Sequence, residues 1–148
     1  MEQWVKDDTR REWRELGFFY DRDDASKEWH LVGSRDGLRR FSGLLRAYVR
    51  DPRNEMKSEH EHYGPYMYLE VMTWPEAGID DHAIRGPLSA LDGLASLVEA
   101  KVGAMKPGGT VRIGDDFAAG TPYALVLALR DDDFDPASLD ANLVGDAG

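Results

Sequence analysis

Residues 87–109, with the sequence PLSALDGLASLVEAKVGAMKPGG, carry the clearest periodic pattern in the chain. Apolar side chains recur there every three or four residues, at Leu88, Leu91, Leu94, Ala95, Val98, Val102 and Met105. This spacing predicts a helix with one face packed on a core. Pro87 suits the first turn of that helix, and the KPGG stretch at 106–109 predicts its end.

A second long helix is predicted over residues 34–50. Leu38, Phe41, Leu45 and Tyr48 repeat at the same helical spacing. Ser34 is a plausible N-cap, and Pro52 ends the helix because the residue before a proline disfavours helical backbone. A short helix before Gly17 is also compatible with the sequence, because Thr9 and Glu12 have the spacing of a capping box.

Strands are predicted at residues 18–22, 28–32, 66–74, 110–114 and 123–130, where aromatic and aliphatic residues gather. Residues 53–65 and 75–86 are predicted to be irregular. The order is therefore β-β-α-β-α-β-β. It predicts an α+β, two-layer sandwich in which a mostly antiparallel five-stranded sheet carries two helices on one face.

The chain has 148 residues, which is the size of one ordinary domain. Residues 1–130 are assigned to a single α+β domain. Residues 131–148 contain no lysine or arginine and are predicted to form an acidic, partly flexible C-terminal tail. We expect the removal of residues 140–148 to have little effect on stability.

Charge and composition exclude several function classes. The 28 acidic and 18 basic residues give a net charge of −10, which argues against nucleic acid and favours a basic partner. The chain has no cysteine, so disulfides, thiolate metal sites and cysteine nucleophiles are excluded. The apolar run at 124–129 is too short to cross a bilayer, and the charged N-terminal residues lack a signal-peptide pattern. We expect a cytoplasmic protein that contacts no membrane.

The predicted strand at 66–74 has one aliphatic and one aromatic face. Met67, Leu69, Val71 and Thr73 alternate with a second set, which is Tyr66, Tyr68, Glu70, Met72 and Trp74. A two-layer fold leaves the second face without a helix over it. Exposed aromatic patches mark contact surfaces, so these five residues are the predicted binding site for a protein partner or a second copy of the chain. The competing prediction is that the chain's own termini cover the face.

Three of the four histidines lie around this strand. His60 and His62 are two residues apart and would point to the same side of an extended segment. With His82 they form a candidate metal site, zinc being the typical ion, in which Glu61 or Asp81 would act as base. The alternative prediction is that these histidines are solvated or structural and that the protein holds no cofactor. No G-x-S-x-G or phosphate-loop motif is present.

The stretch SEHEHYGPYMYL at residues 58–69, with MTW at 72–74 and DDHAI at 80–84, resembles a group of small bacterial proteins, and so does DDFDPASL at 132–139. That resemblance implies no particular activity. Acidic single-domain α+β proteins of this size also resemble immunity proteins of bacterial polymorphic toxin systems. This second resemblance rests on size, charge and fold class, and it implies an inhibitor of a basic partner.

The leading hypothesis is therefore a non-enzymatic, immunity-like protein-binding domain that uses the aromatic sheet face. One alternative is a metal-dependent hydrolase built on the three histidines. The other is a small-molecule binding module that uses the same aromatic side chains as a pocket wall.

Overall fold

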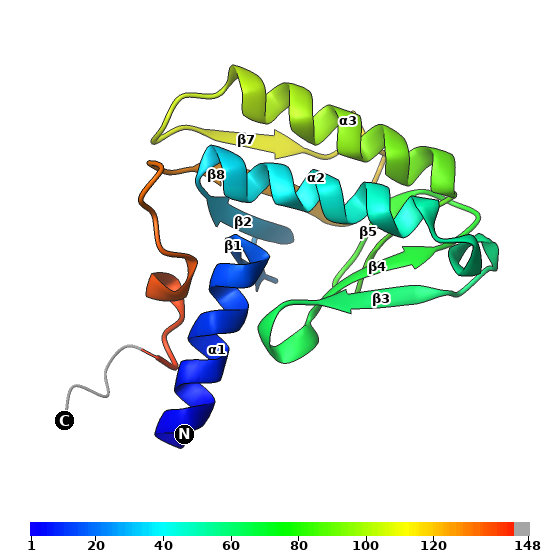
Figure 1. Cartoon of the computed structure of the whole chain (residues 1–148). Coiled ribbons are helices and arrows are strands. Elements are labelled where there is room, and N and C mark those ends of the chain that lie inside the picture. The colour runs from blue at the N-terminus through cyan, green and yellow to red at the C-terminus, as the bar shows by residue number, and fades with distance from the viewer. Residues whose placement is uncertain (144–148) are drawn as a thin grey trace.

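The computed structural model describes residues 1–143 and contains helices, strands and short 3-10 turns (Figure 1). The helices are α1 (Gln3–Leu16), α2 (Arg35–Arg50) and α3 (Leu88–Ala104). The strands are β1 (Phe18–Asp23), β2 (Glu28–Gly33), β3 (His60–Tyr63), β4 (Leu69–Thr73), β5 (Gly78–Ile79), β6 (Ile84–Gly86), β7 (Thr110–Ile113) and β8 (Ala124–Leu129). The 3-10 turns are η1 (Pro52–Glu55), η2 (Pro65–Met67) and η3 (Pro136–Leu139).

The strands form two four-stranded sheets of the same design. The first sheet has the order β1-β2-β8-β7 and the second has the order β3-β4-β6-β5. In each sheet two antiparallel hairpins meet through a parallel pair of inner strands, β2 with β8 and β4 with β6. The first sheet joins the first and last hairpins of the described chain, and the second sheet is made from the hairpins between them.

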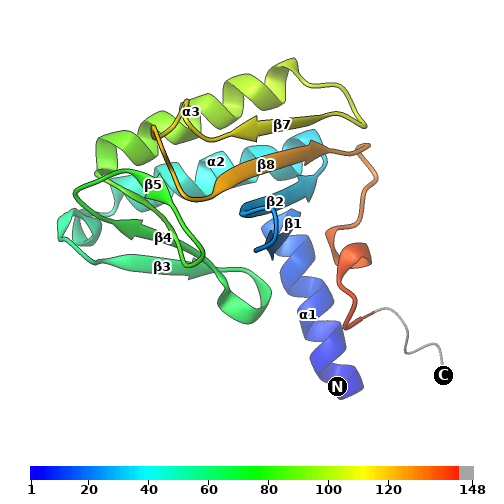
Figure 2. The ribbon, with the colours of Figure 1, turned by 180° about the vertical axis from the view of Figure 1, so that it is seen from behind.

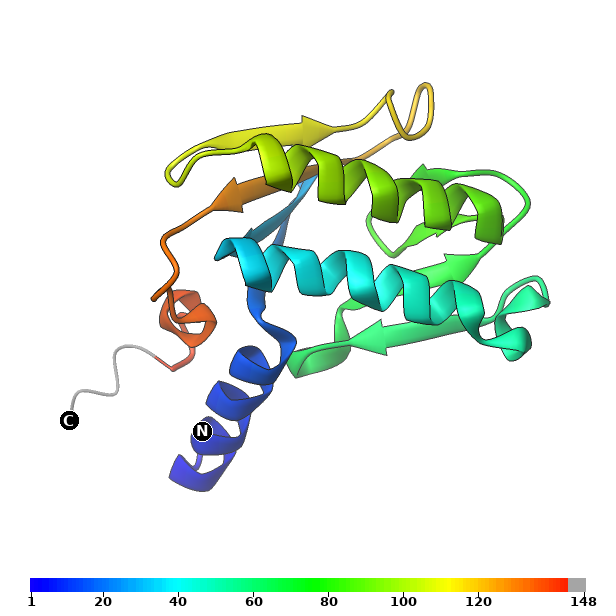
Figure 3. The same cartoon turned by 45° about the horizontal axis from the view of Figure 1, so that its top comes forward.

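The two long helices pack against each other and over the sheets. Figures 1 and 3 show α2 and α3 side by side. Helix α2 contacts β1, β2 and β8, whereas α3 contacts β6 of the second sheet. The core-facing side chains of both helices, including Leu45 and Leu94, are almost fully buried. One hydrophobic core therefore runs beneath both helices.

The local signals at the two long helices act as the sequence predicted. The Ser34 side chain accepts a hydrogen bond from the Gly37 backbone N–H at 3.1 Å, so Ser34 is the N-cap of α2. Helix α2 ends at Arg50, immediately before Asp51 and Pro52. Helix α3 begins one residue after Pro87.

The α+β class is confirmed, but the predicted single five-stranded sheet is wrong. Residues 53–65 contain β3 and residues 75–86 contain β5 and β6, where irregular chain was predicted. These three strands are four, two and three residues long, too short to show a periodic pattern. Strands β3 and β6 form because each pairs with β4, and β5 forms because it pairs with β6.

The predicted strand at 66–74 is also shorter than expected. Strand β4 begins at Leu69, because Tyr66 and Met67 belong to the 3-10 turn η2. Leu69, Val71 and Thr73 are buried, as the alternation predicted. Met67 was expected on the same buried face and is exposed instead.

Helix α1 is longer than the predicted short helix and begins at Gln3 rather than near Thr9. Gly17 ends it with a left-handed backbone (φ 94°), as predicted. The start of α2 packs directly on this end. A Cβ at Gly37 would lie 2.0 Å from the backbone oxygen of Gly17, so the two segments approach closely only because Gly37 has no side chain.

Residues 131–143 run back along α1 (Figures 1 and 2). Arg14 forms an ion pair with Asp135 at 2.9 Å, and the Trp13 indole Nε1–H donates to Asp140 Oδ2 at 2.8 Å. Asp140 and Leu143 are buried. A buried indole N–H needs an acceptor and Asp140 supplies it, so we now expect residue 140 to contribute to stability, unlike the expectation from sequence that residues 140–148 add little. Residues 144–148 lie outside the described residues.

Among residues 1–143, no helix is both long and apolar enough to span a lipid bilayer.

Candidate functional site

Two consecutive residues with left-handed backbone lie just before β4. Tyr66 and Met67 have φ angles of 66° and 57°. This region disfavours residues that carry a side chain, and strain of this kind persists only where surrounding contacts hold it. We call residues 66–68 the aromatic turn.

Hydrogen bonds to two distant residues, Tyr20 and Asp140, hold the aromatic turn. The buried Tyr20 hydroxyl donates to the Pro65 carbonyl and accepts from the Tyr68 backbone N–H at 3.2 Å. The Tyr66 hydroxyl donates to Asp140 Oδ2 at 2.7 Å. Burial of Tyr20 raises its pKa, so its hydroxyl remains a donor throughout the neutral range. The strained turn is therefore fixed by the folded core and is not a loosely held loop.

The aromatic turn presents large side chains to solvent. Tyr66, Met67 and Tyr68 are 38%, 60% and 68% exposed. The rings of Tyr66 and Tyr68 stack with their centroids 6.0 Å apart. Leu69, the next residue, is fully buried. Three large side chains in a row are therefore exposed on a backbone that hydrogen bonds hold in place.

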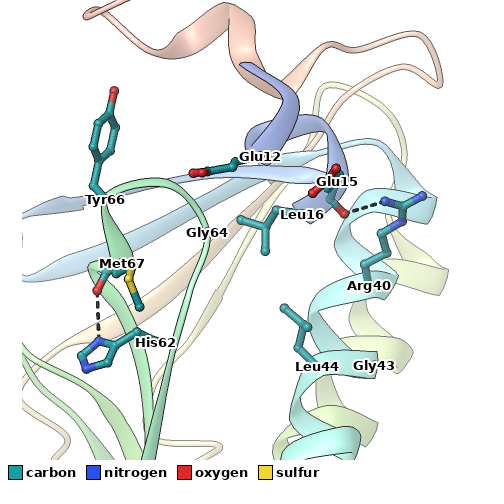
Figure 4. Close-up of a pocket in the computed structure, with 10 residues that line it drawn as sticks. All are labelled: Glu12, Glu15, Leu16, Arg40, Gly43, Leu44, His62, Gly64, Tyr66 and Met67. Carbon is teal, nitrogen blue, oxygen red and sulfur yellow. Dashed lines mark hydrogen bonds between the residues drawn. The ribbon is translucent and has the colours of Figure 1, made fainter. Parts of the chain in front are cut away.

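An open groove lies between the aromatic turn and the two nearest helices. Its volume is about 930 Å³, and Tyr66, Met67 and His62 form one wall. In Figure 4, Leu16 from α1 and Leu44 from α2 point into it. Its helical rim carries charged residues of both signs, which are Glu12, Glu15 and Arg40. We call it the helical groove.

A second groove, which we call the aromatic groove, lies on the other side of Tyr66. Its volume is about 600 Å³, and its lining is Trp13, Phe19, Tyr20, Asp21, Arg22, Trp29, Tyr66, Tyr68, Leu139, Asp140 and Ala141. Trp13 contacts the rings of Phe19 and Tyr20 at centroid distances of 4.9 and 5.1 Å. Four consecutive β1 residues line this groove, and β1 is an edge strand of the first sheet.

Asp140 connects the C-terminal segment, residues 131–143, to both the aromatic turn and α1 through hydrogen bonds. Its Oδ2 atom accepts hydrogen bonds from the Tyr66 hydroxyl and the Trp13 indole, and its Oδ1 atom accepts from the Asn142 backbone N–H at 2.9 Å. Sequence reasoning missed this cluster. Trp13 and Asp140 lie at opposite ends of the described chain, and no local pattern relates them.

The five residues predicted to bind a partner do not share one strand face. Tyr66 and Tyr68 belong to the aromatic turn, whereas Glu70 and Met72 lie on the outer face of β4. Trp74 follows β4, and the Lys57 ammonium lies 4.6 Å from its ring centroid. The C-terminal segment contacts Tyr66 through Asp140, yet Tyr68 stays exposed.

The predicted trio of histidines is also divided. One ring nitrogen each of His60 and His62 and a carboxylate oxygen of Glu70 lie within 4.8 Å of one another. His82 belongs to no such group among residues 1–143; it is exposed in the turn between β5 and β6. The structure therefore does not bring His82 to the other two histidines, and cross-strand pairing places Glu70 opposite His62 instead.

Neither predicted base, Glu61 or Asp81, belongs to the described group of His60, His62 and Glu70. Glu61 lies between them in sequence, but its side chain forms an ion pair with Arg53 at 3.5 Å. Asp81 is exposed beside His82, and its carbonyl accepts from Arg22 at 2.6 Å.

Comparisons with protein-family models, with curated proteins and with solved structures gave no significant match to this chain.

The raised pKa of Tyr66 predicts that stability depends on pH. Burial, followed by the Asp140 carboxylate, raises the pKa of Tyr66 to about 12 from an ordinary value near 10. Between these values the unfolded chain loses a proton that the folded chain keeps, so the free energy of unfolding is expected to fall as the pH rises. NMR titration of the Tyr66 ring should give the raised midpoint, and Asp140→Asn should lower it. A Tyr66 midpoint near 10 in the unmutated protein would contradict this prediction.

Proposed function

We propose that this chain is a non-enzymatic protein-binding domain whose partner docks on the aromatic turn. The observation that carries the proposal is the exposure of Tyr66, Met67 and Tyr68 on a strained backbone that hydrogen bonds to Tyr20 and Asp140 hold. Rigid aromatic side chains lose little conformational entropy on binding, and tyrosine is enriched among the residues that dominate binding energy. This site keeps Tyr66 and Tyr68 of the predicted set and adds Met67.

A partner with a basic contact surface fits the charge of the chain. The net charge of −10 would speed the approach of a positively charged protein. Glu12 and Glu15 line the helical groove on one side of the aromatic turn, and Asp21 lines the aromatic groove on the other. An immunity-like inhibitor of a basic toxin is one form of this function. For such an inhibitor we expect the rate of association with the toxin to fall steeply with added salt.

Binding should depend on the exposed side chains of the aromatic turn. After the partner is identified by cross-linking and mass spectrometry and then purified, Tyr68→Ala and Met67→Ala are each expected to weaken it about tenfold or more, since anchor truncations of this kind cost at least about 1.4 kcal/mol. Stability should change little, because both side chains are largely exposed. The measurements are the Kd by titration calorimetry and the midpoint of thermal unfolding.

Met56→Ala is the matched control, because Met56 is 69% exposed on a different part of the surface. An equal loss of affinity in Met56→Ala, or full affinity in the Tyr68→Ala, Met67→Ala double variant, would exclude the aromatic turn as the binding site. Sedimentation of the unmutated protein distinguishes a second copy of the chain from a different partner. Self-association that the double variant abolishes would identify the partner as another copy.

A small-molecule binding module is the second candidate, and the aromatic groove favours it. Its volume of about 600 Å³ lies within the range of ligand pockets, and its walls are largely aromatic. In this case Tyr68→Ala would abolish a ligand-induced rise in the unfolding midpoint while leaving protein partners unaffected.

A further inference from the structure

His60, His62 and Glu70 form a compact group on the outer face of the second sheet. The two histidines are alternate residues of the edge strand β3, so they occupy the same face. Glu70 lies directly opposite His62 in the antiparallel register of β3 and β4. The side chains meet there, with His62 Nε2 at 3.2 Å from Glu70 Oε1 and the two imidazole centroids 5.2 Å apart.

Backbone carbonyls orient both imidazoles in the way that metal-bound histidines are oriented. The Nδ1 atom of His60 lies 3.1 Å from the Ser58 carbonyl oxygen, and that of His62 lies 3.0 Å from the Met67 carbonyl oxygen. A neutral imidazole that donates from Nδ1 carries its lone pair on Nε2. Metal-ligating histidines almost always donate their other ring N–H to a carbonyl or carboxylate, which fixes both tautomer and ring direction.

Glu70 supplies the charge that such a site needs. Only 14% of its side chain is exposed, and its neighbours on the same face include both histidines. A partly buried carboxylate beside two imidazoles is a stronger ligand for a cation than a solvated one, because fewer water molecules compete for it.

We propose that His60 Nε2, His62 Nε2 and the Glu70 carboxylate bind a divalent first-row transition-metal ion, with zinc as the best match. Imidazole nitrogen ligands favour zinc and its neighbours over magnesium or calcium, which prefer oxygen. Three protein ligands leave a fourth position open to solvent or to a ligand. The 3.2 Å between His62 Nε2 and Glu70 Oε1 already suits two ligands that each lie about 2.0–2.2 Å from one ion, whereas the whole group spans up to 4.8 Å, so His60 draws closer on binding. The exposed His60, on an edge strand, has room for that movement.

This proposal is independent of the proposed function. It nonetheless places the ion next to the aromatic turn, because the Met67 carbonyl of that turn is the hydrogen-bond partner of His62 Nδ1.

The test is zinc titration of the untagged full-length chain after treatment with a chelator, followed by calorimetry. We expect one ion per chain, and His60→Ala and Glu70→Gln should each weaken binding at least about tenfold, since even groups that only orient metal ligands contribute 10–100-fold. His82→Ala and Glu61→Gln are the matched controls and should bind as the unmutated protein does. Glu61 is the sharper control, because it is a carboxylate on the same strand that pairs with Arg53.

Side-chain NMR of the unmutated protein gives a readout that needs no variant. Zinc is expected to shift the imidazole signals of His60 and His62 while those of His30 and His82 stay in place. Saturable shifts confined to His60 and His62 support the site even if Glu70→Gln fails to fold, a condition that far-UV circular dichroism checks. The proposal is overturned if folded His60→Ala or Glu70→Gln binds zinc with full affinity. It is also overturned if His82→Ala weakens binding as much, or if zinc produces no heat and no shift.

Discussion

Leu91→Ala and Leu94→Ala are each expected to lower the free energy of unfolding by about 2–5 kcal/mol, the range found for truncation of buried leucines. Both side chains are at most 1% exposed. They lie on the face of α3 that belongs to the shared core, where α3 packs on α2. Neither site can collapse easily, because α3 packs against both α2 and β6. Chemical denaturation followed by circular dichroism measures the change.

Leu97→Ala is the control for these two variants. It makes the same chemical change within the same helix, at a residue that is only partly buried. Any effect of alanine on helix propensity is therefore shared, and the loss at Leu97 should be clearly smaller. Ordinary surface substitutions change the free energy of unfolding by less than about 0.5 kcal/mol. Losses this small for both Leu91→Ala and Leu94→Ala would show that this face of α3 does not form the core.

Asp140→Ala is expected to lower the free energy of unfolding by about 1.5–3 kcal/mol, as the loss of a hydrogen bond to a charged group does. The change leaves the buried indole N–H of Trp13 without an acceptor. The Tyr66 hydroxyl loses the same acceptor, but it is partly exposed and water can replace the carboxylate there. Thermal and urea unfolding would measure the effect.

Asp132→Ala is the matched control, because Asp132 is exposed in the same C-terminal segment. Both variants remove one negative charge, so a difference between them reports the buried contacts and not the net charge. Equal stability of the two variants would mean that residues near 140 add little to the fold, as the sequence alone suggested.

Helices α2 and α3 and five of the strands, β1, β2, β4, β7 and β8, were predictable because their signals are local. Ser34 caps α2 from within its own first turn, and Leu91 and Leu94 mark their buried face by spacing alone. Strand β5 has only two residues, and its existence depends on pairing with β6. No pattern within so short a segment indicates that partner, so the second sheet was missed.

The candidate sites likewise combine features that local sequence predicts with features that depend on distant residues. The common face of His60 and His62 follows from their spacing in an extended segment. The third member of the group depends on the register between β3 and β4, which places Glu70 and not His82 beside them. The aromatic residues Tyr66 and Tyr68 were identified by type, but their left-handed turn is held by Tyr20 and Asp140, distant residues that no local pattern brings together.

The nested arrangement of the hairpins sets the order in which the fold can be completed during synthesis. Strand β2 pairs with β8, where Glu28 lies opposite Ala124, so the first sheet cannot close until residue 129 has left the ribosome. The second sheet draws on residues 60–86 alone and can pair much earlier. Until β8 arrives, the inner edge of β2 offers unpaired backbone groups beside Trp29 and Leu31, which are apolar and buried in the finished fold. The nascent chain is therefore most prone to aggregation while its last hairpin is still being made.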